Sequence, residues 1–119
     1  MARQGRLAED FACRFLEQRG LRLLTRNYRC RRGEIDLVMK DSDCIVFVEV
    51  RSRGNSRFGS AAESVDRHKQ ARLIAAAQHY LQRHQSIADA PCRFDVVSIA
   101  LTPQTTHPPL QWIQDAFQA

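Results

Sequence analysis

The sequence predicts a mixed α/β fold, with helices packed against a central sheet. Residues 5–19 and 63–83 carry apolar side chains at helical spacing, and residues 34–40 and 45–51 have the apolar pattern of strands. The expected order along the chain is helix, three strands, helix and two strands. A chain of 119 residues has the usual length of one domain, which we place at residues 1–119.

The first predicted helix covers residues 5–19. Its recurring apolar positions are Leu7, Ala8, Phe11, Ala12 and Phe15. Gly20 follows directly, as is typical of the residue that ends a helix. Residues 21–28 then predict a short strand, and residues 29–33 predict a basic turn that leads into the next strand.

A hairpin is predicted next, with strands 34–40 and 45–51 joined by a polar turn at 41–44. This turn sets a register in which Asp36 faces Glu49 and Glu34 faces Arg51. The opposite face of the hairpin is wholly apolar and predicts core. Its members are Ile35, Leu37, Met39, Val46, Val48 and Val50. A slip by one residue would set core residues opposite charged ones, so the register is well specified.

The second half of the chain predicts a Gly, Ser and Arg-rich loop at 52–62, followed by the long helix 63–83. A linker at 84–91 leads to a strand at 93–101, and the segment 110–117 packs against the body. The apolar stripe of the long helix contains Val65, Leu73, Ala76, Ala77, Tyr80 and Leu81.

The opposed acids Asp36 and Glu49 are the main candidate for chemistry. Like charges directly across an antiparallel ladder repel each other, and their Cβ atoms lie roughly 4.5–5.5 Å apart. Two carboxylates at that separation can share a Mg²⁺ or Mn²⁺ ion, which takes oxygen ligands. The alternative is a solvated strand face, in which Arg51 neutralises Glu34 and Glu49.

Two further charged residues belong to the candidate site. Glu9 lies at the edge of the buried stripe of the first helix, where it points either to the acids or to solvent. Lys69 lies inside the stripe of the long helix, four residues after Val65 and four before Leu73. Its ammonium either reaches water along the helix surface or lies at the edge of the acidic patch.

The charge of the chain favours a nucleic-acid partner over a protein that is merely basic. Its net charge is +5, and it has sixteen Arg but only two Lys. Arginine binds phosphate in bidentate fashion and stacks on bases. The basic residues that flank the hairpin are Arg26, Arg29, Arg31, Arg32, Arg53 and Arg57. Tyr28 and Phe58 lie among them, either to stack on bases or to anchor their segments. A metal site rimmed by positive charge fits phosphodiester hydrolysis.

The remaining composition predicts a cytoplasmic protein without a membrane segment. No window approaches the roughly 18 apolar residues of a membrane span, and the N-terminal residues have no signal-peptide core. The four cysteines are widely spaced, which indicates reduced thiols and no zinc site.

Asp36, followed on the next strand by Glu49-Val50-Arg51, resembles the PD-(D/E)XK signature of restriction-endonuclease-like nucleases. The chain more closely resembles the YraN-like family of small bacterial proteins, similar in fold to archaeal Holliday-junction resolvases. The resemblance covers nearly the whole chain. The matching residues are Gly5, Ala8, Glu9, Ala12, Asn27, 33–37, 47–51, Arg53, Phe58, Gly59, Val65, Lys69, 93–97, Trp112, Ile113 and 115–117.

The resemblance implies a restriction-endonuclease-like αβββαβ core with Mg²⁺ or Mn²⁺ bound by Glu9, Asp36 and Glu49. It implies a metal-dependent nuclease that acts on branched or single-stranded DNA in repair or recombination. Junction resolvases act as dimers, so the resemblance also admits a homodimer.

The chain departs from the signature at one position, since Arg51 stands where these nucleases have lysine. Arginine stays protonated and cannot take a proton from water, but it can contact the scissile phosphate. Lys69 is the candidate to replace the missing lysine. The alternative is a non-catalytic nucleic-acid-binding or assembly protein that retains the fold.

Overall fold

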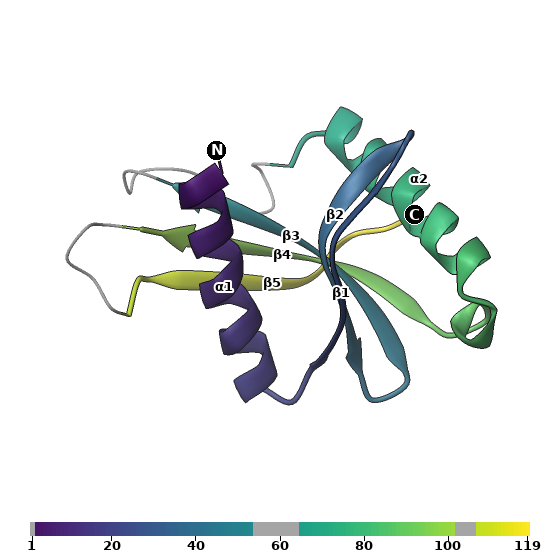
Figure 1. The fold of residues 1–119 in the computed structure, drawn as a ribbon, viewed down its shortest axis with the longest axis horizontal. Coiled ribbons are helices and arrows are strands. Elements are labelled where there is room, and N and C mark those ends of the chain that lie inside the picture. The colour runs from purple at the N-terminus through teal and green to yellow at the C-terminus, as the bar shows by residue number, and fades with distance from the viewer. Residues whose placement is uncertain (1, 54–64, 102–106) are drawn as a thin grey trace.

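A computed structural model describes residues 2–53, 65–101 and 107–119 (Figure 1). Its elements are α1 (Ala2–Gln18), β1 (Arg22–Cys30), β2 (Gly33–Asp41), β3 (Cys44–Arg53), α2 (Arg67–Arg83), the short 3₁₀ helix η2 (Gln85–Ile87), β4 (Cys92–Ala100) and β5 (Leu110–Phe117). This order confirms the predicted mixed α/β class.

The five strands form one sheet in the order β1-β2-β3-β4-β5. Strands β3 and β4 are parallel, and all other neighbours are antiparallel. The parallel pair needs a crossover connection, which contains α2. In Figure 1 the two helices lie on different parts of the sheet, with α2 beside β1 and β2.

Both faces of the sheet are buried. On the α1 face, the core includes Leu16, Leu37, Met39, Val46 and Val48. On the α2 face, it includes Val38, Ile45, Phe47, Leu73 and Tyr80. The hairpin face that carries the acids is therefore polar only near Asp36 and Glu49, because α2 covers the rest of it. One predicted core residue lies on the other side of the sheet: Ile35, expected to share a face with Leu37 and Met39, packs in the core that α2 covers.

The buried stripe of α1 differs from the predicted one. Leu7 is 46% exposed, and Phe11 and Phe15 are half-buried. The predicted Ala8 and Ala12 are buried, and the other buried positions are Cys13 and Leu16. Small side chains at the contact let the helix backbone approach the sheet closely, which places the larger aromatic rings at the margins of the interface.

Several boundaries also differ from the predictions. The helix predicted from residue 63 begins at Arg67, because the Asp66 side chain caps it by accepting a hydrogen bond from the Lys69 backbone N–H at 2.8 Å. Strand β1 continues to Cys30, so the predicted basic turn 29–33 is shorter. Residues 54–62 of the predicted loop lie outside the described residues.

The turn between β1 and β2 packs tightly against α2 at Gly33. A Cβ atom at Gly33 would lie 2.7 Å from the backbone oxygen of Arg72, so only glycine fits without displacement. This contact holds the basic turn beside α2.

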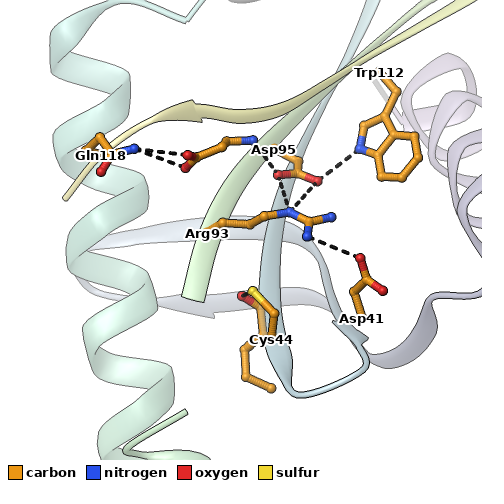
Figure 2. Close-up of polar contacts among 8 residues, drawn as sticks. Asp41, Cys44, Arg93, Asp95, Trp112 and Gln118 are labelled. Carbon is orange, nitrogen blue, oxygen red and sulfur yellow. Dashed lines mark hydrogen bonds and ion pairs between the residues drawn. The ribbon is translucent and has the colours of Figure 1, made fainter. Parts of the chain in front are cut away.

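A buried ionic cluster ties the edge strand β5 to the sheet (Figure 2). The Asp95 carboxylate accepts hydrogen bonds from Arg93 Nε at 3.0 Å, Trp112 Nε1 at 2.9 Å and the Asp115 backbone N–H at 2.9 Å. Arg93 also pairs with Asp41 at 3.2 Å, next to the β2–β3 turn. Because Asp95 is fully satisfied by these donors, we assign the cluster a structural role.

Candidate metal and nucleic-acid site

The acidic pair lies where β2 and β3 stop pairing. Their ladder runs from Asp41 opposite Cys44 to Leu37 opposite Val48, which confirms the predicted register over that stretch. One residue further, the Asp36 Oδ2 atom accepts a hydrogen bond from the Val50 backbone N–H at 2.8 Å. The Asp36 side chain therefore occupies a backbone donor of β3 and is fixed between the two strands.

Glu49 is the most buried acid of the site, with 7% of its side chain exposed. Its Oε2 atom pairs with Lys69 Nζ at 3.2 Å and with Arg51 Nη1 at 3.4 Å. Two cations from different elements thus meet at one carboxylate oxygen. Of the two alternatives for Lys69, the structure shows its ammonium at the acidic patch, although its side chain remains 46% exposed.

The local environment disfavours the charged form of Asp36. Burial and then the negative charge of Glu49 raise the pKa of Asp36 from 3.8 to about 8, while the hydrogen bond from Val50 acts in the opposite direction. The charge of Glu9 adds a smaller upward effect. Without an added positive charge, the pair therefore holds a proton near neutral pH.

These side chains surround a cavity of about 290 Å³. It is lined by Glu34, Asp36, Glu49, Val50, Arg51, Ser52 and Lys69. The predicted polar patch is thus assembled in one place and gains Lys69 from α2. The role of Val50 could not be predicted, because a backbone donor leaves no signal in the side-chain pattern.

Glu9 lies on α1 and is engaged elsewhere. It pairs with Arg26 Nη2 at 3.4 Å, and Arg26 also binds Asp10 at 2.8 Å. Among the described residues, no three His, Cys, Asp or Glu side chains are grouped so as to hold a metal ion. The role of Glu9 as a third ligand stays a prediction.

The donor set of the pair fits part of a Mg²⁺ or Mn²⁺ coordination shell. Both ions prefer carboxylate oxygens and retain several waters, so two protein ligands are compatible with binding. The geometry supports this fit, since both carboxyl groups line the same cavity and the Val50 N–H holds Asp36 in place at 2.8 Å.

The predicted nucleic-acid residues are only partly assembled. Arg29 pairs with Glu34 at 3.2 Å, and both side chains are exposed. Arg31 and Arg32 form the exposed turn after β1. Arg53 ends β3, and its side chain is outside what the structure describes, as are Arg57 and Phe58 as a whole.

Tyr28 is held by protein contacts, which favours the anchoring alternative over base stacking. Its hydroxyl is hydrogen-bonded to His79 Nδ1, and its ring meets Tyr80 edge to face with centroids 4.9 Å apart. In the part of the chain that the structure describes, neither helix is long and apolar enough to cross a membrane.

Comparison with known proteins gives consistent matches over nearly the whole chain. The family model of the uncharacterised protein family UPF0102 matches residues 8–99. A UPF0102 protein of Nitrosococcus oceani is 54% identical over 115 residues, which cover 97% of this chain and 91% of that protein. One of Pseudomonas syringae pv. tomato is 52% identical over 118 residues, covering 97% and 92%. One of Pseudomonas aeruginosa is 50% identical over 116 residues, covering 98% and 93%.

These matches confirm the resemblance to a single family of bacterial proteins. The names of the relatives state no activity, ligand or partner. The wider resemblance to restriction-endonuclease-like nucleases stays a prediction.

Proposed function

The chain belongs to the uncharacterised protein family UPF0102, and on that premise we propose that it is a metal-dependent nuclease that hydrolyses DNA phosphodiester bonds. The observation that supports this most is the pair formed by the half-buried Asp36 and the buried Glu49 at the end of the β2–β3 ladder. Two carboxyl groups that repel each other lower the stability of the fold, and a catalytic use of the pair explains why they are there.

Asp36 and Glu49 would hold Mg²⁺ or Mn²⁺, and Glu9 would add negative charge from α1. The bound ion would activate a water molecule and stabilise the leaving oxygen. The hydrogen bond from Val50 fixes Asp36 in place, so one ligand is oriented before the ion binds.

The two cations on Glu49 have different tasks in this proposal. Arg51 stays protonated and would contact the scissile phosphate, whose developing negative charge it stabilises. Lys69 can exchange a proton and would replace the lysine of the PD-(D/E)XK signature. Its ammonium lies 3.2 Å from Glu49, inside the same cavity as Asp36.

Branched or single-stranded DNA in repair or recombination is the substrate that the resemblance to junction resolvases suggests. The basic turn that follows β1 supports a nucleic-acid ligand, since exposed arginines beside an acidic cavity can follow the phosphates of a strand. In this proposal the arginines of the basic turn supply affinity, while the residues of the acidic cavity supply chemistry.

The direct test is cleavage of a panel of linear, flapped and four-way DNA substrates with Mg²⁺, Mn²⁺ or EDTA. We expect cleavage of at least one substrate only when a divalent ion is present, and none by Glu49→Gln purified in parallel. Equal activity of wild type and Glu49→Gln would identify a contaminating nuclease and contradict the proposal.

Lys69→Ala separates the role of this lysine from that of the metal pair. Loss of a proton-transfer group should reduce the cleavage rate about 100-fold and leave Mn²⁺ binding intact. Arg67→Ala, an exposed change in the same first turn of α2, is the matched control. If Lys69→Ala cleaves DNA like wild type while Glu49→Gln does not, Lys69 does not replace the lysine of the PD-(D/E)XK signature.

A non-catalytic nucleic-acid-binding or assembly protein is the second candidate. Arg51 at the lysine position favours it, as does the pairing of Glu49 with two cations of the chain itself. DNA binding by wild type without cleavage of any substrate, at any divalent ion concentration, would establish this alternative.

A further inference from the structure

A second cavity, of about 400 Å³, lies between β1 and the C-terminal half of α2. Its titratable lining includes Arg29, His79, Arg83 and His84, and none of the residues that line it is an aspartate or glutamate. The acidic cavity is lined by three carboxyl groups, whereas this cavity is lined by basic side chains without any carboxyl group, which predicts an anionic ligand.

The walls of this cavity are fixed by hydrogen bonds and ring contacts. Tyr80 binds Thr25 through its hydroxyl at 2.9 Å and stacks on His84 with centroids 3.9 Å apart. His84 Nδ1 lies 2.7 Å from the Tyr80 backbone oxygen, and His79 Nδ1 is bonded to Tyr28. Both histidines are thus oriented through Nδ1. Their Nε2 atoms make no hydrogen bond within the described residues.

The arginines supply the charge. Arg83 is exposed at the last turn of α2 and forms no ion pair with any residue that the structure describes. Arg29 pairs only with the exposed Glu34, an interaction that solvent weakens. A guanidinium presents a planar fork that matches phosphate oxygens, which makes a phosphate ester the anion that best fits this lining.

The two cavities adjoin through one ion pair. Arg29 lines the basic cavity, and its partner Glu34 lines the acidic cavity. Arg29 and Glu34 are also direct partners in the β1–β2 ladder. A strand whose scissile phosphate lies at Asp36 and Glu49 would therefore pass Arg29 and reach Arg83.

We propose that the basic cavity between β1 and α2 binds a phosphate group of the same DNA strand that occupies the acidic cavity. The inference rests on the proposed function for the identity of the ligand as DNA, but not on cleavage. The bound group is either an internal phosphodiester or a terminal phosphomonoester, two sources of one chemistry.

The test is binding of fluorescent single-stranded DNA in EDTA, followed by anisotropy over a range of salt concentrations. We expect Arg83→Gln to weaken binding about fivefold at low salt. It should also reduce the slope of log K against log salt concentration by about 0.7, as expected for the loss of one phosphate contact. Arg29→Gln should act in the same direction. Arg22→Gln, an exposed arginine of β1 outside the cavity, is the matched control and should match wild type.

Oligonucleotides with and without a 5′-phosphate distinguish the two sources. If the two variants lose affinity equally for both oligonucleotides, the cavity binds an internal phosphodiester. If they lose affinity only for the phosphorylated oligonucleotide, it binds a terminal phosphate. If folded Arg83→Gln and Arg29→Gln bind both strands like wild type, the inference is overturned. Cleavage by wild type in that case leaves the proposed function standing. A binding defect without any cleavage by wild type leaves the inference standing alone.

Discussion

Asp36 shows how one residue can be fixed in position and yet electrostatically unfavourable. Its carboxylate accepts a good hydrogen bond from Val50, but burial and Glu49 raise its pKa to about 8. An ordinary aspartate in the unfolded chain titrates at about 3.9. The folded protein therefore keeps a proton on Asp36 over a pH range in which the unfolded chain has lost it.

This difference has a defined sign for stability. Between about pH 4 and pH 8 the folded state binds more protons than the unfolded state, so the free energy of unfolding falls as pH rises through this window. Asn cannot titrate, and it keeps an oxygen that accepts from Val50. In EDTA, the stability of Asp36→Asn relative to wild type should therefore rise by several kcal/mol between pH 4 and pH 8.5.

Chemical denaturation at several pH values measures this effect. If the stability difference between Asp36→Asn and wild type does not change between pH 4 and pH 8.5, the description of the acidic pair is contradicted.

At the scale of elements, close packing between the β1–β2 turn and α2 places the basic turn. The backbone of Gly33 lies so near Arg72 that an added Cβ would approach its oxygen to 2.7 Å. The neighbour is backbone rather than a flexible side chain, so the strain cannot be relieved by a rotamer change. Both cavities border the β1–β2 turn, because β2 contributes Glu34 and Asp36 to the acidic cavity and β1 contributes Arg29 to the basic cavity.

Gly33→Ala should therefore lower the free energy of unfolding by about 1–3 kcal/mol, the usual cost of overpacking. Urea denaturation followed by circular dichroism measures it. Gly20→Ala is the comparison. An added Cβ at Gly20 would meet nothing within 4 Å, so the stability lost there comes from the positive φ of 98° and not from overpacking. A Gly33→Ala variant as stable as wild type would show that the turn does not press against α2.

The register of the hairpin from Leu37 to Asp41 could be predicted from the sequence because side chains alternate along a paired strand. Where the ladder ends the alternation also ends, and Ile35 packs on the α2 side instead of beside Leu37. Alternation alone predicts that Asp36 and Glu49 lie side by side. The buried stripe of α1 could not be predicted as well, because the large residues Phe11 and Phe15 dominate a hydrophobicity pattern while the contact itself uses small alanines. The predicted start of α2 is wrong for a different reason, since Asp66 provides the cap within an otherwise continuous helical pattern.

At the scale of the whole molecule, the sheet brings together residues that no sequence pattern relates. Lys69 reaches Glu49 because α2, which follows β3 in the chain, packs against β1 and β2 and brings its first turn to the end of the β2–β3 ladder. The basic cavity combines β1 with the end of α2 in the same way, and residues 25–29 and 79–84 share no sequence signal. The homodimer and the cytoplasmic location stay predictions.

The central claim is that Asp36 and Glu49 form a divalent metal site. Calorimetric titration of Mn²⁺ into wild type at pH 8 tests it most directly, with Asp36→Asn as the variant that removes one ligand. We predict one site in wild type, weaker at pH 6.5 because the ion must displace the proton of Asp36, and no site in Asp36→Asn. No Mn²⁺ binding by folded wild type, even with DNA present, would contradict the claim and favour the non-catalytic binding protein.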